Sequence, residues 1–567
     1  IWIGENMFSS ELWNKPAGGA GGANFYTHQI AHSVRNNFDQ NGTMLRTPGT
    51  PSSTTTMTLS MWIQKQTAFP YANGYASKGN ENLLFTSGSG GGYMFITTDG
   101  PGLTAEVGGV GYLITNALLR DTSAFYHIVL RVDTTQGTTA NRLRFYINGV
   151  EPTYSNVTAQ SISQNAAFPL LASGVAQGIG GVAGVGHTTI GTDTTFAEVV
   201  FNDGQSYGPD SYGEFKNGVW IPKDPSGLTF GNQGFHLNFA NASAFGNDVS
   251  GNNNDFTVAN FSTHDQSLSS PTFNSNSNGG NFATLGRLWK TPTTLTLSEG
   301  NLRGTTTTNN IGAMSNWAVP DGGKWYWEVN YSDQYSSATS MYVGIAYADT
   351  SLTSAETADQ VVYYTENGMK IIESTRSSYG TGFDSPSGDA VVGVAVDRVN
   401  DTLNFSYNGT WQGTFSISGL SNNEFFPFTM PTGVNGTQGY TYNFGQDGTF
   451  AGKFTAQGNS DDTGYGNFKY AVPTGFLAMC AGNLPVADTI DPAQTDDNYP
   501  QELFFMSQYS GNLSNRTITT ENKPDLIFNR QYVYAQNWYV VDSTRGITAN
   551  KYILTNTTAL EATLPQG

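Results

Sequence analysis

The stretch GKWYWEVNY at residues 323–331 constrains the fold of this chain more than any other part of its sequence. Aromatic and β-branched side chains crowd this short run, which directly follows a Pro-Asp-Gly-Gly turn signal at residues 320–323. Such a run after a tight turn is typical of a β-strand with both faces of its sheet occupied. Further runs of the same kind follow at regular spacing, at residues 341–347, 390–397 and 402–407. This region is therefore predicted to fold into short β-strands joined by tight turns.

The last of these runs leads into Asn408 and Gly409, the strongest short signal for a β-hairpin, and then into another strand-like run at residues 411–415. Taken together, the motifs GKWYWEV, YVGIA, VGVAVD and LNFSYNGTW resemble the SPRY domain, over residues 282–485. The resemblance implies a bent antiparallel β-sandwich that acts in recognition, and it implies no catalytic residues.

A second group of strand-like runs lies closer to the N-terminus. Residues 57–64 (MTLSMWIQ) alternate between apolar and polar side chains, which is the period of a β-strand. In chain order, MTLSMWIQK, FYHIVLRVD, RLRFYINGVE and AEVVFNDGQ resemble concanavalin-A-like, laminin-G-like jelly rolls, over residues 23–245. The stretch at residues 218–239 is similar to the end of such domains in phage-encoded structural proteins, where an SPRY-like domain commonly follows.

The composition supports an all-β fold and argues against several classes of partner. Charged residues make up only 12% of the 567 residues and aromatic residues reach 13%, which suits many short strands joined by polar turns. The net charge of −19 argues against nucleic acid, because phosphate binding needs clustered cations. No apolar run approaches the ~18 residues that span a bilayer, so no membrane insertion is expected. The single cysteine, Cys480, excludes an intrachain disulfide.

The predicted organisation is a tandem of antiparallel β-sandwiches with flanking segments. It comprises an N-terminal arm (1–22), a concanavalin-A-like jelly roll (23–245), a polar linker (246–281), an SPRY-like sandwich (282–485) and the incomplete start of a further β-rich domain (486–567). The arm ends in a Gly-rich run, and the linker is too polar to bury a core of its own. Because the chain begins with Ile1 and shows no signal-peptide pattern, we expect a processed product or part of a longer one.

Two glutamates are the nearest candidates for glycosidase chemistry, because concanavalin-A-like folds include glucanases with paired carboxylates. Retaining cleavage requires two carboxyl groups about 5–5.5 Å apart, which residues two or four apart on one strand can supply. Glu198 and Glu328 lie in strand-like runs, but neither has a second carboxylate two or four residues further along. No catalytic residue and no enzymatic activity is therefore predicted.

Two groups of residues could hold a metal ion, but neither pattern is sufficient. His28 and His32 have the spacing of a zinc-protease helix, yet Gln29 stands in place of the general-base glutamate. Hard oxygen ligands for Ca²⁺ could come from a polar stretch that contains Asp248, Asn252, Asn254 and Asp255. Some laminin-G-like domains bind calcium, but polar turns of this composition are common. We therefore predict no metal site and no cofactor, with Ca²⁺ as an open alternative.

Aromatic side chains on loops are the remaining candidates for ligand binding. A large ring with a polar tip stacks on sugars or anchors protein partners. The rings in Gly-, Ser- or Asn-rich segments are Tyr71, Tyr75, Trp317, Tyr335, Tyr379 and Phe383. Trp325 and Trp327 lie within a strand-like run and are expected in the core.

These features together predict a non-catalytic structural or adhesion protein on the exterior of a bacteriophage virion, such as a tail fibre, spike or capsid-attached fibre. It would recognise a host-surface glycan or protein, or dock to other virion proteins. A polysaccharide depolymerase and a secreted bacterial adhesin are the alternatives.

The protein is expected to form a homo-oligomer, with a trimer as the expected state. Linking copies raises avidity by ~10²–10⁴ for individually weak contacts, and cyclic symmetry is how identical chains close. The N-terminal arm and the region after Gln501 are expected to hold the oligomer, because they look least able to bury their own apolar side chains. Those side chains are Trp2, Phe8, Trp13, Leu503, Phe504 and Phe505.

Overall fold

The chain divides into two compact units, Ile1–Pro485 and Val486–Gly567. The computed structural model describes residues 25–37, 40–66, 83–89, 92–97, 102–181, 192–216, 218–273, 278–286, 294–333, 340–382, 390–433 and 437–484 of the first unit, and 510, 517–518, 524–530, 537–544, 551–558 and 560–563 of the second. The regular structure of these residues is β-strand or short 3₁₀ turn, which confirms the predicted all-β fold. None of them belongs to a helix long and apolar enough to cross a membrane.

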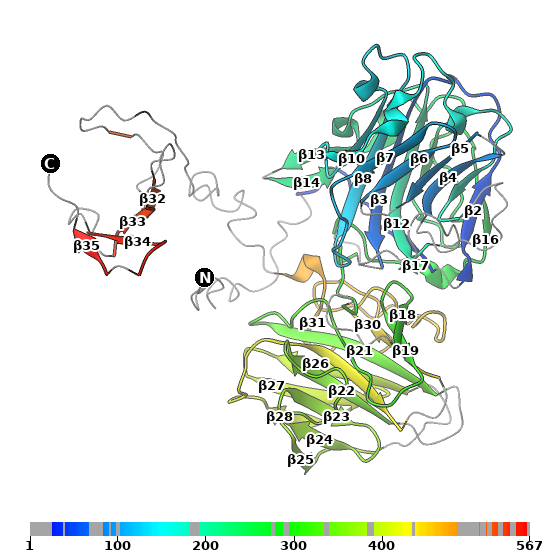
Figure 1. Ribbon diagram of the computed structural model, residues 1–567. Helices are drawn as coiled ribbons and strands as arrows, with labels where there is room; N and C mark the ends of the chain where they lie inside the picture. The colour runs from blue at the N-terminus through cyan, green and yellow to red at the C-terminus, as the bar shows by residue number, and fades with distance from the viewer. Residues whose placement is uncertain are drawn as a thin grey trace. The chain divides into compact units, whose positions relative to one another are not determined.

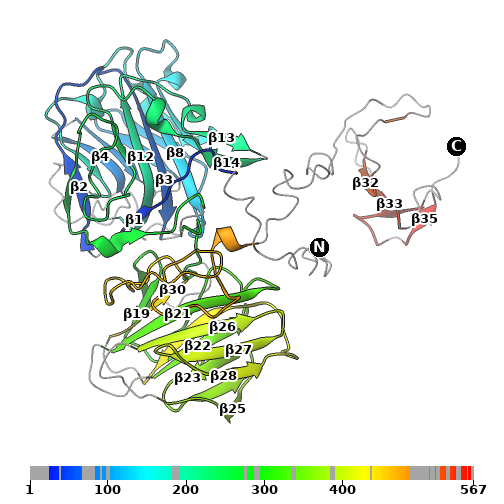
Figure 2. The ribbon, with the colours of Figure 1, turned by 180° about the vertical axis from the view of Figure 1, so that it is seen from behind.

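The first sandwich of the first unit is built from two antiparallel sheets (Figures 1 and 2). One sheet consists, in spatial order, of β17 (Gln266–Ser267), β1 (Ser33–Asn36), β12 (Thr194–Asp203), β3 (Thr56–Lys65), β8 (Phe125–Asp133) and β9 (Leu143–Ile147), with β15 (Phe235–Leu237) also paired to β12. The other consists of β10 (Tyr154–Asn156), β7 (Gly111–Thr115), β6 (Thr104–Val107), β5 (Gly92–Thr97), β4 (Leu83–Ser89), β11 (Gln177–Ile179), β2 (Thr43–Arg46) and β16 (Thr257–Ala259).

Alternation along β3 decides which side chains enter the core of this sandwich. Leu59, Met61 and Ile63 belong to the buried apolar cluster between the two sheets. Trp62 lies on the opposite face of the strand, as the period of two requires, and is also buried. That outer face is covered by chain that includes the hairpin of β13 (Gly213–Lys216) and β14 (Val219–Pro222). Both faces of the first sheet are therefore packed.

Two strands of the first sandwich come from the segment predicted as a polar linker. Within residues 246–281, β16 pairs with β2 and β17 pairs with β1. Phe256 is buried in the core of the sandwich, and Val258 and Phe261 pack against it. These few apolar side chains give an otherwise polar segment enough contact to complete the edges of both sheets, so it differs from the predicted linker.

The second sandwich also has two antiparallel sheets. One consists of β18 (Leu295–Ser298), β19 (Arg303–Thr306), β30 (Gln438–Asn443), β21 (Lys324–Asp333), β26 (Ala390–Asp397), β27 (Thr402–Tyr407) and β28 (Thr410–Ser416), with β31 (Leu477–Ala478) parallel to β21. The other consists of β20 (Ala313–Met314), β29 (Phe425–Thr432), β22 (Ser340–Tyr347), β23 (Gln360–Tyr364), β24 (Met369–Ile372) and β25 (Thr375–Ser378).

The stretch GKWYWEVNY at residues 323–331 forms most of the central strand β21. Trp325 and Trp327 are buried in the core between the sheets, which confirms their prediction. The predicted hairpin joins β27 to β28, with φ of 45° at Asn408 and 81° at Gly409. Two consecutive residues in this left-handed region are what a two-residue hairpin turn needs, and Asn followed by Gly accepts it at the lowest cost.

The described part of the second unit is an antiparallel sheet of β32 (Leu526–Asn529), β33 (Tyr539–Asp542), β34 (Lys551–Leu554) and β35 (Ala562–Thr563). Val540 is buried, whereas Leu526 and Phe528 are 53% and 57% exposed. This segment is β-rich, and its assignment as the start of a further domain stays a prediction.

Candidate functional site

The two glutamates considered as catalytic candidates are both buried on the outer faces of central strands. Glu198 lies on β12 and is 6% exposed, while Glu328 lies on β21 and has no exposed surface. In each case the neighbouring strand residues, such as Val199 and Val329, point into the core on the opposite face. Both of these carboxylates therefore lie beneath a layer of covering chain.

Two histidines bind Glu198. Nε2 of His28, from the segment that precedes β1, lies 3.0 Å from Oε1 of Glu198, and Nε2 of His236, on β15, lies 2.9 Å from the same oxygen. Burial raises the pKa of Glu198, but the hydrogen bonds and charges of the two imidazoles outweigh it and lower the pKa to about 2. Burial lowers the pKa of His28, and the bond to Glu198 reverses this, so that the pKa is raised overall. The contact is an ion pair held in a poorly hydrated place.

A third histidine lies next to this group and stays neutral. Nε1 of Trp220 donates to Nδ1 of His127 at 3.0 Å, and Nε2 of His127 lies 2.8 Å from Oγ of Ser60. Because Nδ1 accepts a hydrogen bond, the proton of the neutral ring must be on Nε2, which then donates to the serine. Burial lowers the pKa of His127 to about 3. The ring also stacks on Trp62 with 4.7 Å between centroids, as expected of a packing residue.

The covering segment above Glu198 is tied down at several points. Nζ of Lys216, on β13, donates to the carbonyl oxygen of Phe25 at 2.7 Å. Oγ1 of Thr27 donates to Oε1 of Glu214 on the same strand at 3.2 Å. These contacts hold the segment against the hairpin of β13 and β14, and Glu198 is buried beneath it.

Four donors bind Glu328, and its partners in the described part of the chain include no cation. The hydroxyl of Tyr326 (3.0 Å) and the backbone N–H of Tyr470 (2.8 Å) donate to Oε1. Nδ2 of Asn443 (3.2 Å) and the backbone N–H of Lys469 (2.9 Å) donate to Oε2. Burial nevertheless outweighs these bonds and raises the pKa of Glu328 to about 7. The carboxylate fastens the returning segment around residues 469–470 to the sheet.

The histidines at positions 28 and 32 do not form a zinc site. They lie in extended and irregular chain rather than on a helix, so a spacing of four does not place them on one face. His28 is committed to Glu198, and burial lowers the pKa of His32. Within the described residues, no group of three or more His, Cys, Asp or Glu side chains is arranged to hold a metal ion.

The polar stretch considered for Ca²⁺ is engaged in its own turn. The carboxylate of Asp248 accepts the backbone N–H of His236, Ser250 and Asn254, at 2.8–2.9 Å. Oδ1 of Asp255 accepts the backbone N–H of Asp248 at 2.8 Å. The amides of Asn252 and Asn254 donate to carbonyl oxygens of residues 231–234. Internal donors therefore occupy both carboxylate oxygens of Asp248 and one of Asp255.

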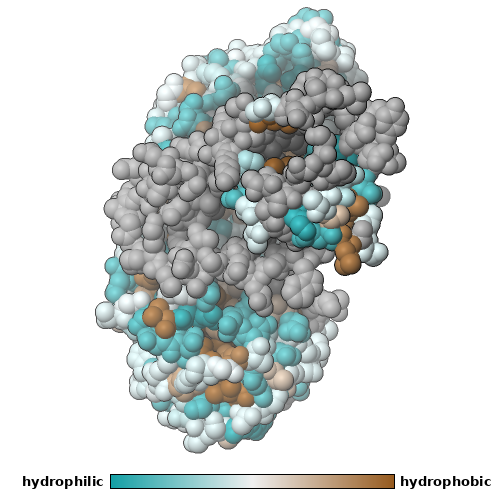
Figure 3. All heavy atoms as spheres, turned by 90° about the vertical axis from the view of Figure 1, so that its left-hand side faces the viewer, coloured by the Kyte–Doolittle hydropathy of each residue, from teal (hydrophilic) through white to brown (hydrophobic). Residues whose placement is uncertain are grey.

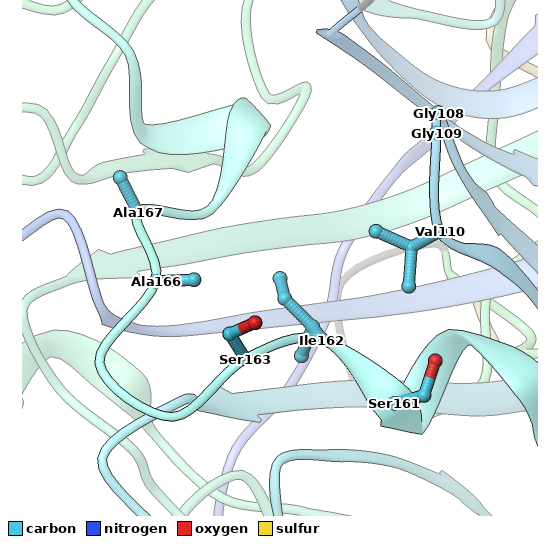
Figure 4. A pocket seen from close by; sticks show the side chains of 8 residues that line it. All are labelled: Gly108, Gly109, Val110, Ser161, Ile162, Ser163, Ala166 and Ala167. Atoms are coloured by element: carbon cyan, nitrogen blue, oxygen red, sulfur yellow. The ribbon is translucent and has the colours of Figure 1, made fainter.

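One hollow of about 420 Å³ opens at the first sandwich (Figure 4). It lies between the turn that joins β6 to β7 and the chain that follows β10. Its lining residues are Gly108, Gly109, Val110, Ser161, Ile162, Ser163, Ala166 and Ala167. These side chains include two hydroxyls but no charge and no aromatic ring, so they provide neither acid–base groups nor a platform for stacking a sugar.

The aromatic candidates are only partly within the described residues. Trp317 and Tyr379 are half-buried and pack against the core of the second sandwich. The hydroxyl of Tyr379 donates to the carbonyl oxygen of Gly413 and accepts the backbone N–H of Phe405 at 3.0 Å. Both rings therefore have structural contacts, and their role in ligand binding stays a prediction. The others lie outside the described residues: Tyr71, Tyr75, Tyr335 and Phe383.

The sequence alone points to both glutamates but not to the residues that bind them. His236 and Asn443 lie 38 and 115 residues from the carboxylates that they bind. No motif or spacing connects residues this far apart. The one local signal is the period of two, which places Glu198 and Glu328 on the face opposite the core.

Two known protein families match the chain, one within each sandwich. Residues 39–184 match the concanavalin A-like lectin/glucanases superfamily, and residues 324–447 match the SPRY domain. No curated protein matches the chain.

Similar solved structures align with only part of the chain. The SPRY domain of human HERC1 is 14% identical, with 25% of this chain and 87% of that chain covered and a TM-score of 0.21. The PSpry domain of TRIM65 is 14% identical, with 29% and 92% covered and a TM-score of 0.23. Stonustoxin is 20% identical, with 28% of this chain and 27% of that chain covered and a TM-score of 0.22. On the family matches, the chain contains a concanavalin A-like domain followed by an SPRY domain.

Proposed function

We propose that this protein is a non-catalytic structural or adhesion protein on the exterior of a virion, in the manner of a bacteriophage tail fibre, spike or capsid-attached fibre. Its task is to recognise a host-surface glycan or protein, or to dock to other virion proteins. The tandem of a concanavalin A-like domain and an SPRY domain supports the proposal, because both are folds used for binding.

The burial of Glu198 and Glu328 is the observation that carries the non-catalytic part of the proposal. A glycosidase needs two carboxyl groups on either side of an accessible glycosidic bond. Here Glu198 is bound to two histidines, and both oxygens of Glu328 accept hydrogen bonds from the protein. Their function is to hold covering segments in place, which favours binding over hydrolysis.

Several large apolar side chains are well exposed in the described part of the first unit. They are Leu118, Val150, Val157, Phe215, Val249 and Val399. Figure 3 shows one face of the molecule, on which hydrophobic spots are separated by hydrophilic and neutral surface. Such a surface suits hydrogen bonding to a hydroxyl-rich ligand, supplemented by single apolar contacts such as Phe215 at the hairpin of β13 and β14.

The test compares binding and hydrolysis by the full chain on one set of ligands. An array of purified bacterial surface polysaccharides is probed for binding, and the same polysaccharides are assayed for release of reducing ends. Binding without release is the expected result. Release of reducing ends that is lost in Glu198→Gln or Glu328→Gln would instead indicate a depolymerase, and binding to no polysaccharide and to no bacterial surface protein would contradict adhesion.

We also propose a homo-oligomer, with a trimer as the expected state. The exposed Leu526 and Phe528 on β32 support it, because a small sheet gains stability when such exposed apolar side chains pack against another surface. Light scattering on the full chain should give three times the monomer mass. A monomer at micromolar concentration would contradict this part of the proposal.

A further inference from the structure

The two sandwiches of the first unit meet at Arg35, a charged side chain that is buried from water. Arg35 lies on β1 of the first sandwich, and Asp447 follows β30 of the second. Nη2 of Arg35 donates to Oδ2 of Asp447 at 2.8 Å, and the two side chains are only 2% and 4% exposed. The same nitrogen also donates to the carbonyl oxygen of His264. A single guanidinium thus bridges the two sandwiches and the chain between them.

Further carboxylates surround this guanidinium. Glu299, in the turn between β18 and β19 of the second sandwich, accepts from Nδ2 of Asn37 at 3.1 Å and from Nε2 of Gln40 at 2.9 Å. Asp265, at the end of the 3₁₀ turn Thr263–Asp265, is buried and acts on Arg35 electrostatically, as Glu299 does. The Arg35 guanidinium of the first sandwich therefore faces two carboxylates of the second sandwich, Asp447 and Glu299, together with Asp265 from the segment directly before β17.

Asp447 is itself fixed in the frame of the second sandwich. Its Oδ1 accepts from the backbone N–H of Thr449 at 2.9 Å, and its Oδ2 accepts from that of Ala451 at 3.0 Å. Its own N–H donates to Oδ1 of Asn443 at 3.1 Å, and Nδ2 of Asn443 donates to Glu328. A continuous chain of hydrogen bonds therefore leads from Arg35 to the central strand of the second sandwich.

We propose that Arg35 is a latch that fixes the orientation of the two sandwiches, so that they move as one rigid body. The physical reason is the cost of breaking it. Buried opposite charges compensate each other, but if one partner is removed the other remains in a poorly hydrated place with no counter-charge. A polar contact with defined geometry also allows fewer relative orientations than an apolar one would. Binding surfaces on both sandwiches are then held at a fixed spacing.

The first experiment measures local opening by amide hydrogen exchange on the full chain. Arg35→Met removes the charge and keeps the length of the side chain, and Asp447→Asn removes the partner charge with almost no change in shape. Amides in 264–268 and 446–452 are expected to exchange at least tenfold faster in both variants, while those in β3 and β26 keep the wild-type rate. Arg376→Met is the control, because Arg376 forms an exposed ion pair with Glu356 within the second sandwich. Exchange in the two segments of Arg35→Met within twofold of wild type would overturn the proposal.

The double variant Arg35→Met with Asp447→Asn distinguishes a latch from general damage. Because the double variant leaves neither Arg35 nor Asp447 as a buried charge without the other, its protection at 264–268 and 446–452 is expected to return toward wild type relative to either single variant. If a single variant unfolds completely, the double variant still tests whether Arg35 and Asp447 act as a latch. Recovery of the fold supports the latch, and persistent unfolding or additive loss of protection contradicts it.

The second experiment measures orientation directly. Spin labels are placed on the exposed Ser226→Cys in the first sandwich and Ser418→Cys in the second, since the natural Cys480 is buried. A narrow distance distribution is expected with Arg35 present, and a distribution at least twice as broad in Arg35→Met. A broad distribution in the labelled protein that retains Arg35 would overturn the proposal whether or not the chain binds a glycan.

Discussion

Glu198 in the first sandwich and Glu328 in the second occupy similar places, each on a central strand and beneath a covering segment. Their surroundings differ in charge. Glu198 is bound by two imidazoles, which lower its pKa to about 2, whereas Glu328 is bound by neutral donors, and burial raises its pKa to about 7. Burial alone therefore does not decide the charge of a carboxylate. The sign depends on whether a counter-charge is buried with it.

The largest effect is expected from Glu328→Gln. An amide nitrogen would face donors that now bind a carboxylate oxygen, which leaves buried N–H groups of Lys469 or Tyr470 without an acceptor. We expect the free energy of unfolding to fall by about 3 kcal/mol, the cost of one or two unsatisfied buried donors. Urea denaturation measures this against the exposed control Glu424→Gln, and a loss below about 0.5 kcal/mol would show that the four hydrogen bonds contribute little.

The burial of Glu328 should also make the stability of the protein depend on pH. Glu328 holds its proton more tightly in the folded state, with a pKa of about 7, than at its ordinary value of 4.5. The free energy of unfolding should therefore fall as pH rises from about 4.5 to about 7, by up to about 3 kcal/mol for this group. Urea denaturation at pH 5 and pH 8 measures the fall, which should be smaller in Glu328→Gln. Equal falls in both proteins would assign the pH dependence to other groups.

Glu198→Gln should cost less than Glu328→Gln. The amide oxygen of a glutamine can still accept from Nε2 of His28 and of His236, so the variant loses charge but keeps acceptor capacity. We expect a loss of about 1–2 kcal/mol at pH 6, where charge-assisted hydrogen bonds become neutral ones. If urea denaturation shows Glu198→Gln to be the more damaging of the two variants, the contrast between the two sites is wrong.

The smallest effect is expected from His28→Gln, because His28 is partly exposed and holds only the covering segment. A loss of about 1 kcal/mol or less is expected, with faster amide exchange confined to residues 26–31. Because the pKa of His28 is raised, its contribution to the free energy of unfolding is complete below about pH 6.5 and is lost as the pH rises through the raised pKa. Because the pKa of Glu198 is lowered, its own contribution is lost as the pH falls from about 4.5 toward 2. Exchange that spreads into β12 would show a wider role.

The covering segments also show where prediction from the sequence fails. The segment at 246–281 reads as a linker because its composition is polar, yet Phe256 and a few neighbours suffice to add β16 and β17 to existing sheets. A strand at the edge of a sheet can be held by a few apolar side chains on the face that meets the core. The composition of such a segment is therefore a weak signal for a strand. Fold class and strand order were predictable, but this boundary was not.

The sequence by itself determined the strands, the turns and the order of the two sandwiches. These depend on local chemistry: the period of two in β3, the aromatic run of β21, and the left-handed backbone that Asn408 and Gly409 accept. Only the tertiary structure decided which groups surround Glu198 and Glu328, and that Arg35 meets Asp447 across 412 residues of chain. Such contacts depend on how the sheets pack against one another, and the spacing of residues along the chain does not specify that packing.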